Sequence, residues 1–244
     1  MAKETLKDNF VTTITNEILS GEIKFGTKMP TERELAERFH VSRGVINRGL
    51  IKLANDGFIS IVPRVGSYVN NYIQRGNIHT VTALMNFSSY NFSDETLLAI
   101  ATEVKSLIEI KGAIDTLTVS LIGNTLQEDD YCELSKILEK FENNCNCNSS
   151  CISNNCVFCT EYLFEFYSKL CEISGNTITS LMYNSFKQPI SNLWARYLKL
   201  YTSALLKEHA RAILNALHNK APESAIAQIH QLIIDTTVGT HLIY

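Results

Sequence analysis

The chain has 244 residues, enough for one large domain or two ordinary domains of about 150 residues each. Hydrophobic residues make up 45% of it and charged residues 19%, with only four prolines, which excludes disordered and collagen-like chains. No apolar run approaches the ~18 residues of a membrane helix, and the first residues do not form a secretion signal, so we expect a cytoplasmic protein.

The formal net charge of −3 is unevenly distributed along the chain. Residues 1–70 hold ten lysines and arginines against eight aspartates and glutamates, so this part is net +2 and the remainder is net −5. The sequence therefore places a small basic surface on a mildly acidic body.

Two helices are predicted in the first forty residues. Apolar residues between Phe10 and Leu19 recur at helical spacing, which predicts a first helix that ends near Gly21. Pro30 opens the second helix. Thr31 and Glu34 have the spacing of a capping box, in which each side chain satisfies a backbone donor at the helix start.

A third helix and a hairpin complete this part of the chain. Ser42 is a good N-cap for a helix over 43–56, and Gly57 is well placed to stop it. A hairpin over 58–69 follows, with its turn at 63–66. This order is that of a winged helix-turn-helix, whose last helix enters the major groove of DNA.

The residue types suit contact with DNA. The start of the third helix offers free N–H groups and a hydroxyl to phosphate, while Arg43, Asn47 or Arg48 can reach base edges. Arg64 at the wing tip suits phosphate or the minor groove. The alternative is that these charges only solvate exposed helix faces. The ordered series of caps, apolar spacing and basic wing favours DNA binding.

Over residues 5–70 the chain closely resembles the GntR family of bacterial transcription regulators. The resemblance is carried by the segment G-E-I-K-F-G-T-K-M-P-T-E-R-E-L-A-E-R-F-H-V-S-R at 21–43, followed by Leu50, Leu53, Gly57 and G-S-Y-V at 66–69. The residue types and this resemblance together give the candidate DNA-binding residues, which are Arg33, Ser42, Arg43, Gly44, Val45, Asn47, Arg48, Arg64 and Gly66. The family commonly has Thr-Val-Arg where this chain has Val45-Ile46-Asn47, so we expect Asn47 or Arg48 to read a different base.

Beyond Tyr72 the sequence is helical in period and nearly free of strand signals, which predicts a bundle of six or seven helices. The predicted helices are 78–85, 93–122, 127–141, 157–174, 177–200, 203–217 and 222–242. A winged helix followed by such a bundle resembles the FadR subfamily of GntR regulators. We therefore predict a mainly α fold, with a DNA-binding domain at 1–72 and an all-helical effector-binding and dimerisation domain at 73–244.

Many members of that subfamily hold a divalent metal through one Asp and three His. The positions that align with these ligands are Leu163, Tyr167, Ala210 and Leu232. None of them ligates metal in the usual way, so the resemblance predicts no metal site and no cofactor. His209 and His230 lie near two of these positions, and we interpret both as hydrogen-bonded surface residues.

The resemblance also suggests the class of effector. A member that responds to fatty acids lacks the metal and binds a long acyl-CoA, so an acyl-CoA or another organic acid derivative is the expected effector. Candidate effector contacts are Lys105, Tyr167, Trp194, Arg196 and Tyr197, on helices that line the pocket in the family. Surface or core packing is the alternative for each of them.

Five of the seven cysteines fall in a short Asn/Ser-rich stretch, at Cys145, Cys147, Cys151, Cys156 and Cys159. Thiolates at this spacing can hold zinc or an iron–sulfur cluster, or form a redox switch. Only one pair has the usual C-x2-C spacing, so we favour a loop of reduced thiols. Cys132 and Cys171 occupy apolar helical positions and are expected in the core.

Together these patterns predict a ligand-responsive transcription regulator. We expect a homodimer on a short palindromic operator of double-stranded DNA, with recognition helices ~34 Å apart, and no membrane partner. The first alternative is a thiol- or metal-sensing regulator that uses the Cys145 to Cys159 cluster. The second is an enzyme fused to a DNA-binding domain. The sequence opposes this second alternative because it has neither an H-E-x-x-H motif nor a glycine-rich cofactor loop.

Overall fold

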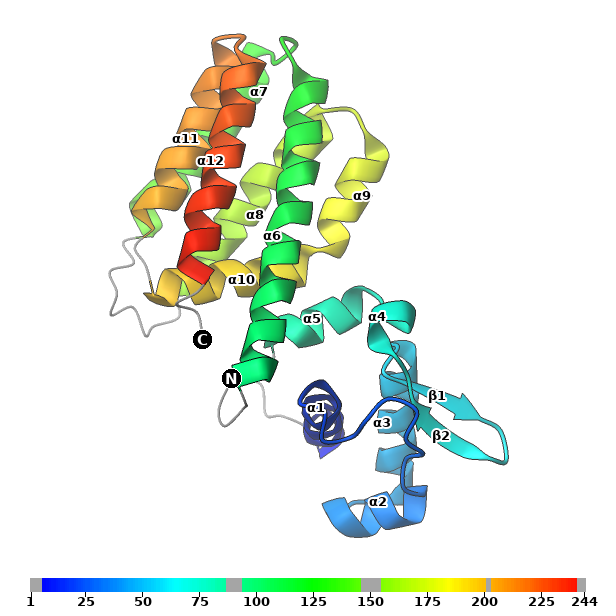
Figure 1. The fold of residues 1–244 in the computed structure, drawn as a ribbon. Coiled ribbons are helices and arrows are strands. Elements are labelled where there is room, and N and C mark those ends of the chain that lie inside the picture. The colour runs from blue at the N-terminus through cyan, green and yellow to red at the C-terminus, as the bar shows by residue number, and fades with distance from the viewer. Residues whose placement is uncertain (1–5, 87–93, 146–154, 201–202, 241–244) are drawn as a thin grey trace. The chain divides into compact units, whose positions relative to one another are not determined.

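The computed structural model describes residues 6–86, 94–145, 155–200 and 203–240, which are mostly helical (Figure 1). The chain divides into two compact units, Met1–Thr96 and Leu97–Tyr244. The predicted fold class, a winged helix-turn-helix followed by a helical bundle, is confirmed. None of the described helices is long and apolar enough to cross a membrane.

The first unit contains helices α1 (Leu6–Leu19), α2 (Glu32–Phe39) and α3 (Arg43–Asn55), strands β1 (Ile59–Val62) and β2 (Gly66–Val69), and helices α4 (Tyr72–Arg75) and α5 (Ile78–Asn86). Helix α4 was not predicted; it is a single turn that begins where Asn71 Oδ1 accepts a hydrogen bond from the Ile73 amide at 3.1 Å. Both α4 and α5 fall within the compact unit Met1–Thr96.

The predicted caps set the starts of α2 and α3. The Thr31 amide donates to Glu34 Oε2 at 2.7 Å and the Glu34 amide donates to Thr31 Oγ1 at 3.3 Å, which completes the capping box. Ser42 Oγ accepts from the Val45 amide at 3.4 Å. His40 adopts a left-handed conformation between the two helices, so the chain turns sharply there.

The core of the first unit fixes how closely α3 approaches α1. Phe10 is fully buried, and a Cβ placed on Gly49 would lie 2.3 Å from its ring, so only glycine allows this approach. The hairpin is antiparallel, with Ile59 opposite Val69 and Val62 opposite Gly66. Ile59 and Val69 are buried in the same core, which anchors the wing to α3.

The second unit contains α6 (Asp94–Ile122), α7 (Glu128–Asn144), α8 (Asn155–Ile173), α9 (Thr177–Ser185), α10 (Lys187–Leu200), α11 (Ala204–His218) and α12 (Pro222–Thr240). The single helix predicted over 177–200 is wrong, because the chain breaks at Phe186 into α9 and α10. Pro189 explains the break. It has no N–H for the carbonyl of Ser185 four residues earlier, and its ring would clash with that carbonyl in a continuous helix.

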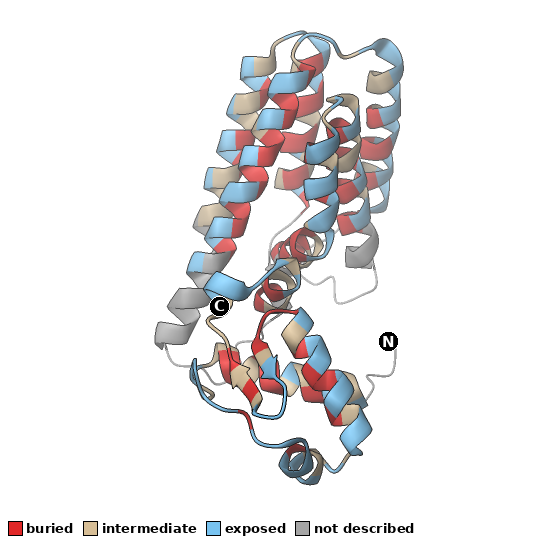
Figure 2. Cartoon of the chain, turned by 90° about the vertical axis from the view of Figure 1, so that its right-hand side faces the viewer, coloured by how far each residue is buried: buried red, intermediate tan, exposed pale blue. Residues whose placement is uncertain are grey.

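Buried residues gather on the inner sides of these helices, and exposed residues cover their outer sides (Figure 2). The largest fully buried side chains of the bundle are Phe141, Phe166 and Tyr183. Cys171 is buried as expected, but Cys132 is exposed, so its assignment to the core is wrong. Cys132 lies on α7, whose buried stripe runs instead through Leu134, Ile137, Leu138 and Phe141.

Candidate DNA interface and effector cavity

Helix α3 presents one polar face to solvent. The predicted contacts Ser42, Arg43, Gly44, Asn47 and Arg48 are exposed, and Val45 is half-buried. The opposite face is held in the core by Ile46, Leu50 and Leu53. Because the helix starts at this exposed end, its free N–H groups and the positive end of its dipole lie beside Arg43. This arrangement attracts phosphate.

Arginines give this unit a cationic surface. Arg43, Arg48 and Arg64 are exposed and make no ion pair with any residue in the described ranges. Arg33 lies 3.7 Å from Glu37, in a pair whose side chains are 69% and 70% exposed. Such a pair contributes little stability, so a phosphate can replace Glu37 as the partner of Arg33.

Asn47 lies one turn after Arg43, and a residue of α2 orients it. Asn47 Nδ2 donates a hydrogen bond to Glu32 Oε1 at 2.8 Å. The bond uses one of the two N–H donors of the amide, so Oδ1 and the second N–H are left to meet a base. An acceptor in the major groove pairs with the amino group of cytosine or adenine.

A second cation, Lys28, lies beside the wing and was not among the predicted contacts. Arg64 occupies the tip with a φ of 65°, and Gly66 has a φ of 134°. Lys28 pairs with Tyr68 through a β-bridge, and a Cβ on Gly66 would lie 2.9 Å from Lys28 Cε. Glycine at 66 therefore makes room for Lys28 beside the wing. Its segment has neither a helical nor a strand pattern, so the sequence held no signal for this placement.

The second unit contains a small cavity of about 30 Å³, room for one or two water molecules. It lies between α6, α10 and α12 and is lined by Ile108, Lys111, Gly112, Asp115, Leu193, Trp194, Tyr197, Ile229, Leu232, Ile233 and Thr236. The lining is mostly aliphatic and aromatic with a few polar groups, which is the residue composition of small-molecule sites, although such sites are larger, at about 300 to 1,000 Å³.

Two opposite charges lie in this cavity wall. Lys111 Nζ donates to Asp115 Oδ2 one turn later, and the side chains are only 8% and 4% exposed. Lys111 Nζ also lies 3.7 Å from the ring centre of Tyr167 and 5.2 Å from that of Trp194. Burial raises the pKa of Asp115, and the neighbouring ammonium opposes that rise. Burial, and secondarily the charge of Asp115, raises the pKa of Tyr167 well above its usual value.

The structure distributes the five predicted effector contacts differently. Trp194 and Tyr197 line the cavity. Tyr167 does not line it, but its ring contacts the ammonium of Lys111. Lys105 is exposed, 3.8 Å from Glu109, and does not line the cavity. The side chain of Arg196 lies outside the described residues. Lys111 and Asp115 were not among the predicted contacts, although both line the cavity.

Comparison with known proteins then decides the family. Residues 6–69 match the family described as "Bacterial regulatory proteins, gntR family", and residues 106–235, more than half of the chain, match the FCD domain. The chain belongs to the GntR family and carries an FCD domain. The regulator is thus assigned to the FadR-like branch of that family, whose members are transcription regulators and not enzymes.

Its relatives support the same assignment. The regulator is 28% identical over 142 residues to the uncharacterised HTH-type transcriptional regulator YcbG of Bacillus subtilis, a match that spans 58% of this chain and 54% of that protein. It is 24% identical over 207 residues to the fatty acid metabolism regulator protein of Vibrio cholerae, covering 75% and 73% of the two chains. The solved structure of Lar, which controls expression of the Listeria monocytogenes agr system, covers the whole chain with a TM-score of 0.62 at 14% identity, a likeness of fold.

The four positions aligned with the family's metal ligands lie inside the bundle. Leu163, Tyr167, Ala210 and Leu232 are all buried. Their side chains supply no carboxylate or imidazole, so the residues present do not fit the usual metal. At one of these positions, the Tyr167 ring contacts the ammonium of Lys111.

The two histidines near these positions differ. His230 is exposed, as expected, but His209 is 4% exposed, so its interpretation as a surface residue is wrong. His209 is buried because α11 packs on α12, where Nδ1 lies 3.2 Å from Gln228 Oε1 and Nε2 lies 3.1 Å from Asp235 Oδ2. The predicted hydrogen bonding of His209 is confirmed.

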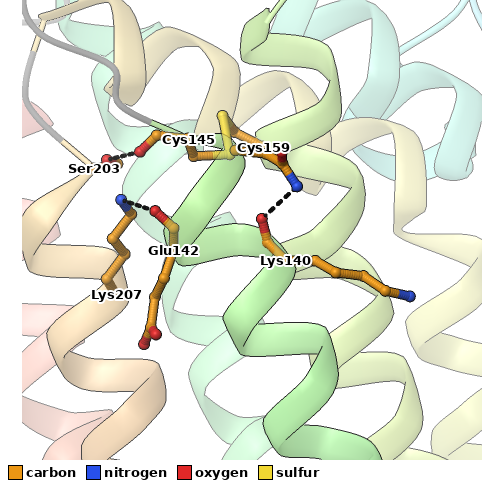
Figure 3. The surroundings of a disulfide bond; sticks show 7 residues. Lys140, Glu142, Cys145, Cys159, Ser203 and Lys207 are labelled. Atoms are coloured by element: carbon orange, nitrogen blue, oxygen red, sulfur yellow. Dashed lines mark hydrogen bonds between the residues drawn. A yellow bond between two sulfur atoms is a disulfide. The ribbon is translucent and has the colours of Figure 1, made fainter.

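A disulfide joins α7 to α8, and a hydrogen bond joins α11 to the same point. Cys145 at the end of α7 and Cys159 near the start of α8 form a disulfide with a Cα–Cα distance of 5.5 Å (Figure 3). The expected reduced state is therefore wrong for these two residues, because packing of α7 on α8 brings them within bonding distance. Ser203 Oγ donates to the Cys145 carbonyl at 2.9 Å, which joins α11 to the same point. Cys147 and Cys151, and the side chain of Cys156, lie outside the described residues.

The two free cysteines whose side chains the structure describes are expected to differ in reactivity. Burial raises the pKa of the Cys171 thiol to about 11, while Cys132 is exposed. The thiolate is the reactive form, so iodoacetamide at pH 8 should modify Cys132 and spare Cys171 in the folded protein. Peptide mapping by mass spectrometry measures this, and both residues should react in denaturant. Equal modification of the two thiols without denaturant would contradict the burial of Cys171.

Proposed function

We propose that the regulator binds a short palindromic operator as a homodimer in the cytoplasm and releases or engages it when an effector enters the helical bundle. The observation that carries the DNA-binding proposal is the exposed start of α3, where Arg43 and Arg48 have no ionic partner among the described residues. The candidate contacts are those named from the sequence, together with Lys28. Phosphates would position the helix, while Asn47 and the arginines would read bases.

The test is selection from a library of randomised duplexes, followed by fluorescence anisotropy with the enriched sequence. We expect a palindrome whose half-site centres lie about one helical turn apart. Affinity should fall linearly with the logarithm of salt concentration, because phosphate contacts release counterions. Failure to enrich any sequence would refute the proposed operator.

Homodimerisation is supported by a second apolar face on α6. Ile110, Leu117 and Leu121 recur along this face and are 48%, 49% and 44% exposed. Since the other face of α6 lies in the bundle core, the helix is apolar on two sides, which indicates a covered surface. Ile178 and Leu181 on α9 are also exposed. A second copy is the proposed occupant because a palindromic operator requires two recognition helices.

Replacing Leu117 by glutamate is expected to convert the dimer to a monomer, because it places a charge in the proposed apolar interface. Sedimentation velocity at micromolar concentration measures the change. Ala227→Glu, on an exposed position of α12, is the matched control and should remain dimeric. Loss of the paired contact should also weaken operator binding by about 100-fold or more. A wild-type monomer, or a dimeric Leu117→Glu variant, would count against this interface.

The effector proposal rests on the cavity between α6, α10 and α12. Its apolar lining with Lys111, Asp115 and Thr236 suits an organic acid derivative such as an acyl-CoA. The resemblance to a Vibrio cholerae protein named for fatty acid metabolism supports that class. A coupling of about 1 to 3 kcal/mol, some 5- to 150-fold in operator affinity, is enough for a switch.

A thiol-sensing function is the second candidate, favoured by the Cys145–Cys159 disulfide. Reduction would release a loop closed over 14 residues and lower the free energy of unfolding by about 3 kcal/mol. A sensor should then bind the operator at least fivefold differently with and without reductant. The double variant Cys145→Ser/Cys159→Ser should bind the operator equally well with and without reductant. Equal affinity of both wild-type forms would leave the disulfide a structural role only.

A further inference from the structure

The polar groups of the bundle cavity set a condition on the charge of its ligand. Lys111 and Asp115 are the charged residues among those that line it, and they are bonded to each other. The pair is therefore neutral as a whole.

The ammonium nevertheless keeps hydrogen-bonding capacity. Lys111 has three N–H donors, and Asp115 is its hydrogen-bond acceptor among the described residues. The rings of Tyr167 and Trp194 hold the ammonium through their π faces, at 3.7 and 5.2 Å, without forming conventional hydrogen bonds. A ligand oxygen in the cavity can therefore accept a hydrogen bond from Lys111 while Asp115 continues to balance its charge.

A negatively charged ligand would bring a charge that no group in the cavity neutralises. A carboxylate placed beside Lys111 would give this buried site two anions and one cation, and an uncompensated buried charge is strongly unfavourable. The carbonyl of an amide, ester or thioester accepts the same hydrogen bond without adding charge. We infer that the cavity selects uncharged acyl compounds over the corresponding free acids, with Lys111 binding the carbonyl and Asp115 cancelling the charge. The inference rests on the proposed effector site and narrows its ligand class.

The present cavity is smaller than an acyl chain, so binding requires the helices to separate. We expect α6 and α12 to separate at Gly112 and Ile233, where they are in close contact: a Cβ on Gly112 would lie 2.1 Å from Ile233 Cδ1. Ile233 thus fills the space that the missing side chain leaves between α6 and α12. A ligand chain would displace Ile233 and expand the site beside Trp194.

Trp194 makes the test direct, because it is the single tryptophan of the chain and lines the cavity. Its fluorescence therefore reports occupancy without reference to DNA. The probes are hexanamide and octanamide against hexanoate and octanoate at pH 7.5, matched in chain length and different in head-group charge. We expect the wild type to bind each amide at least tenfold more tightly than its acid.

Asp115→Asn supplies the decisive comparison. Asparagine has nearly the same shape and still accepts from Lys111, but it leaves the ammonium without a counter-charge. The ratio of amide to acid affinity should fall at least tenfold in this variant. Lys111→Met/Asp115→Leu removes both charges and should lose the tight binding of the amide. Thermal unfolding and operator affinity without probe show whether each variant is folded.

Three results would overturn the inference: wild type that binds an acid as tightly as its amide, an unchanged ratio in Asp115→Asn, or no response of Trp194 to any probe. If Asp115→Asn does not fold, the wild-type ratio and the double variant decide. These results are distinct from failure of the proposed function. Wild type that binds its operator but ignores every probe rejects only the ligand class, whereas probe binding that leaves operator affinity unchanged rejects only the switch.

Discussion

Replacing Arg43 by alanine is expected to lower affinity for the selected operator by about 5- to 150-fold, equivalent to ~1 to 3 kcal/mol. Arg43 is the first residue of α3 and is exposed beside the free N–H groups of the helix start. Its removal takes away a cation where the helix dipole already favours an anion. The stability of the protein should be unaffected, because the side chain has no partner among the described residues.

Fluorescence anisotropy at several salt concentrations separates two roles for Arg43. A phosphate contact should reduce the slope of log affinity against log salt by about one, and affinity should fall equally on all sequences. A base contact should instead relax the preference at one position of each half-site. Lys136→Ala on α7 is an exposed cation of the other unit and serves as the control. Unchanged affinity of Arg43→Ala would remove α3 from the proposed interface.

The exposed face of α3 was largely predictable because its determinants are local. A capping box between Thr31 and Glu34, an N-cap at Ser42 and helical spacing of apolar residues each involve positions a few residues apart. Such patterns fix which face of α3 is buried and hence which residues are exposed. The orientation of Asn47 was not predictable, because its partner Glu32 lies 15 residues away on another helix.

In the bundle, too, features that depend on more than local apolar spacing were not predicted. Its helices follow from apolar periodicity, but the break at Phe186 depends on the missing N–H of Pro189, which periodicity does not register. Lys111 and Asp115 were overlooked because charges on a helix are usually exposed, and their burial is known only when α6, α10 and α12 are assembled around them. The disulfide likewise required the packing of α7 against α8.

The largest effect on stability is expected from Lys111→Ala, which should lower the free energy of unfolding by about 3 to 5 kcal/mol. The loss arises because Asp115 stays buried without its cation, and not because the pair itself stabilises the fold strongly. Lys111→Met/Asp115→Leu replaces both charges by apolar groups and should therefore be close to wild type in stability. Urea denaturation of the three proteins measures this difference.

The pH dependence of Lys111→Ala provides an independent check. Burial already raises the pKa of Asp115, and loss of the ammonium should raise it further. Between its unfolded pKa and this higher folded pKa, the folded state holds a proton that the unfolded state has released, so stability decreases as pH rises through that interval. The destabilisation should accordingly be smaller at pH 5 than at pH 8, whereas the double variant should show no such difference from wild type. A loss of stability that is equal at both pH values would mean that lost packing of the Lys111 side chain, and not an unpaired carboxylate, causes the effect.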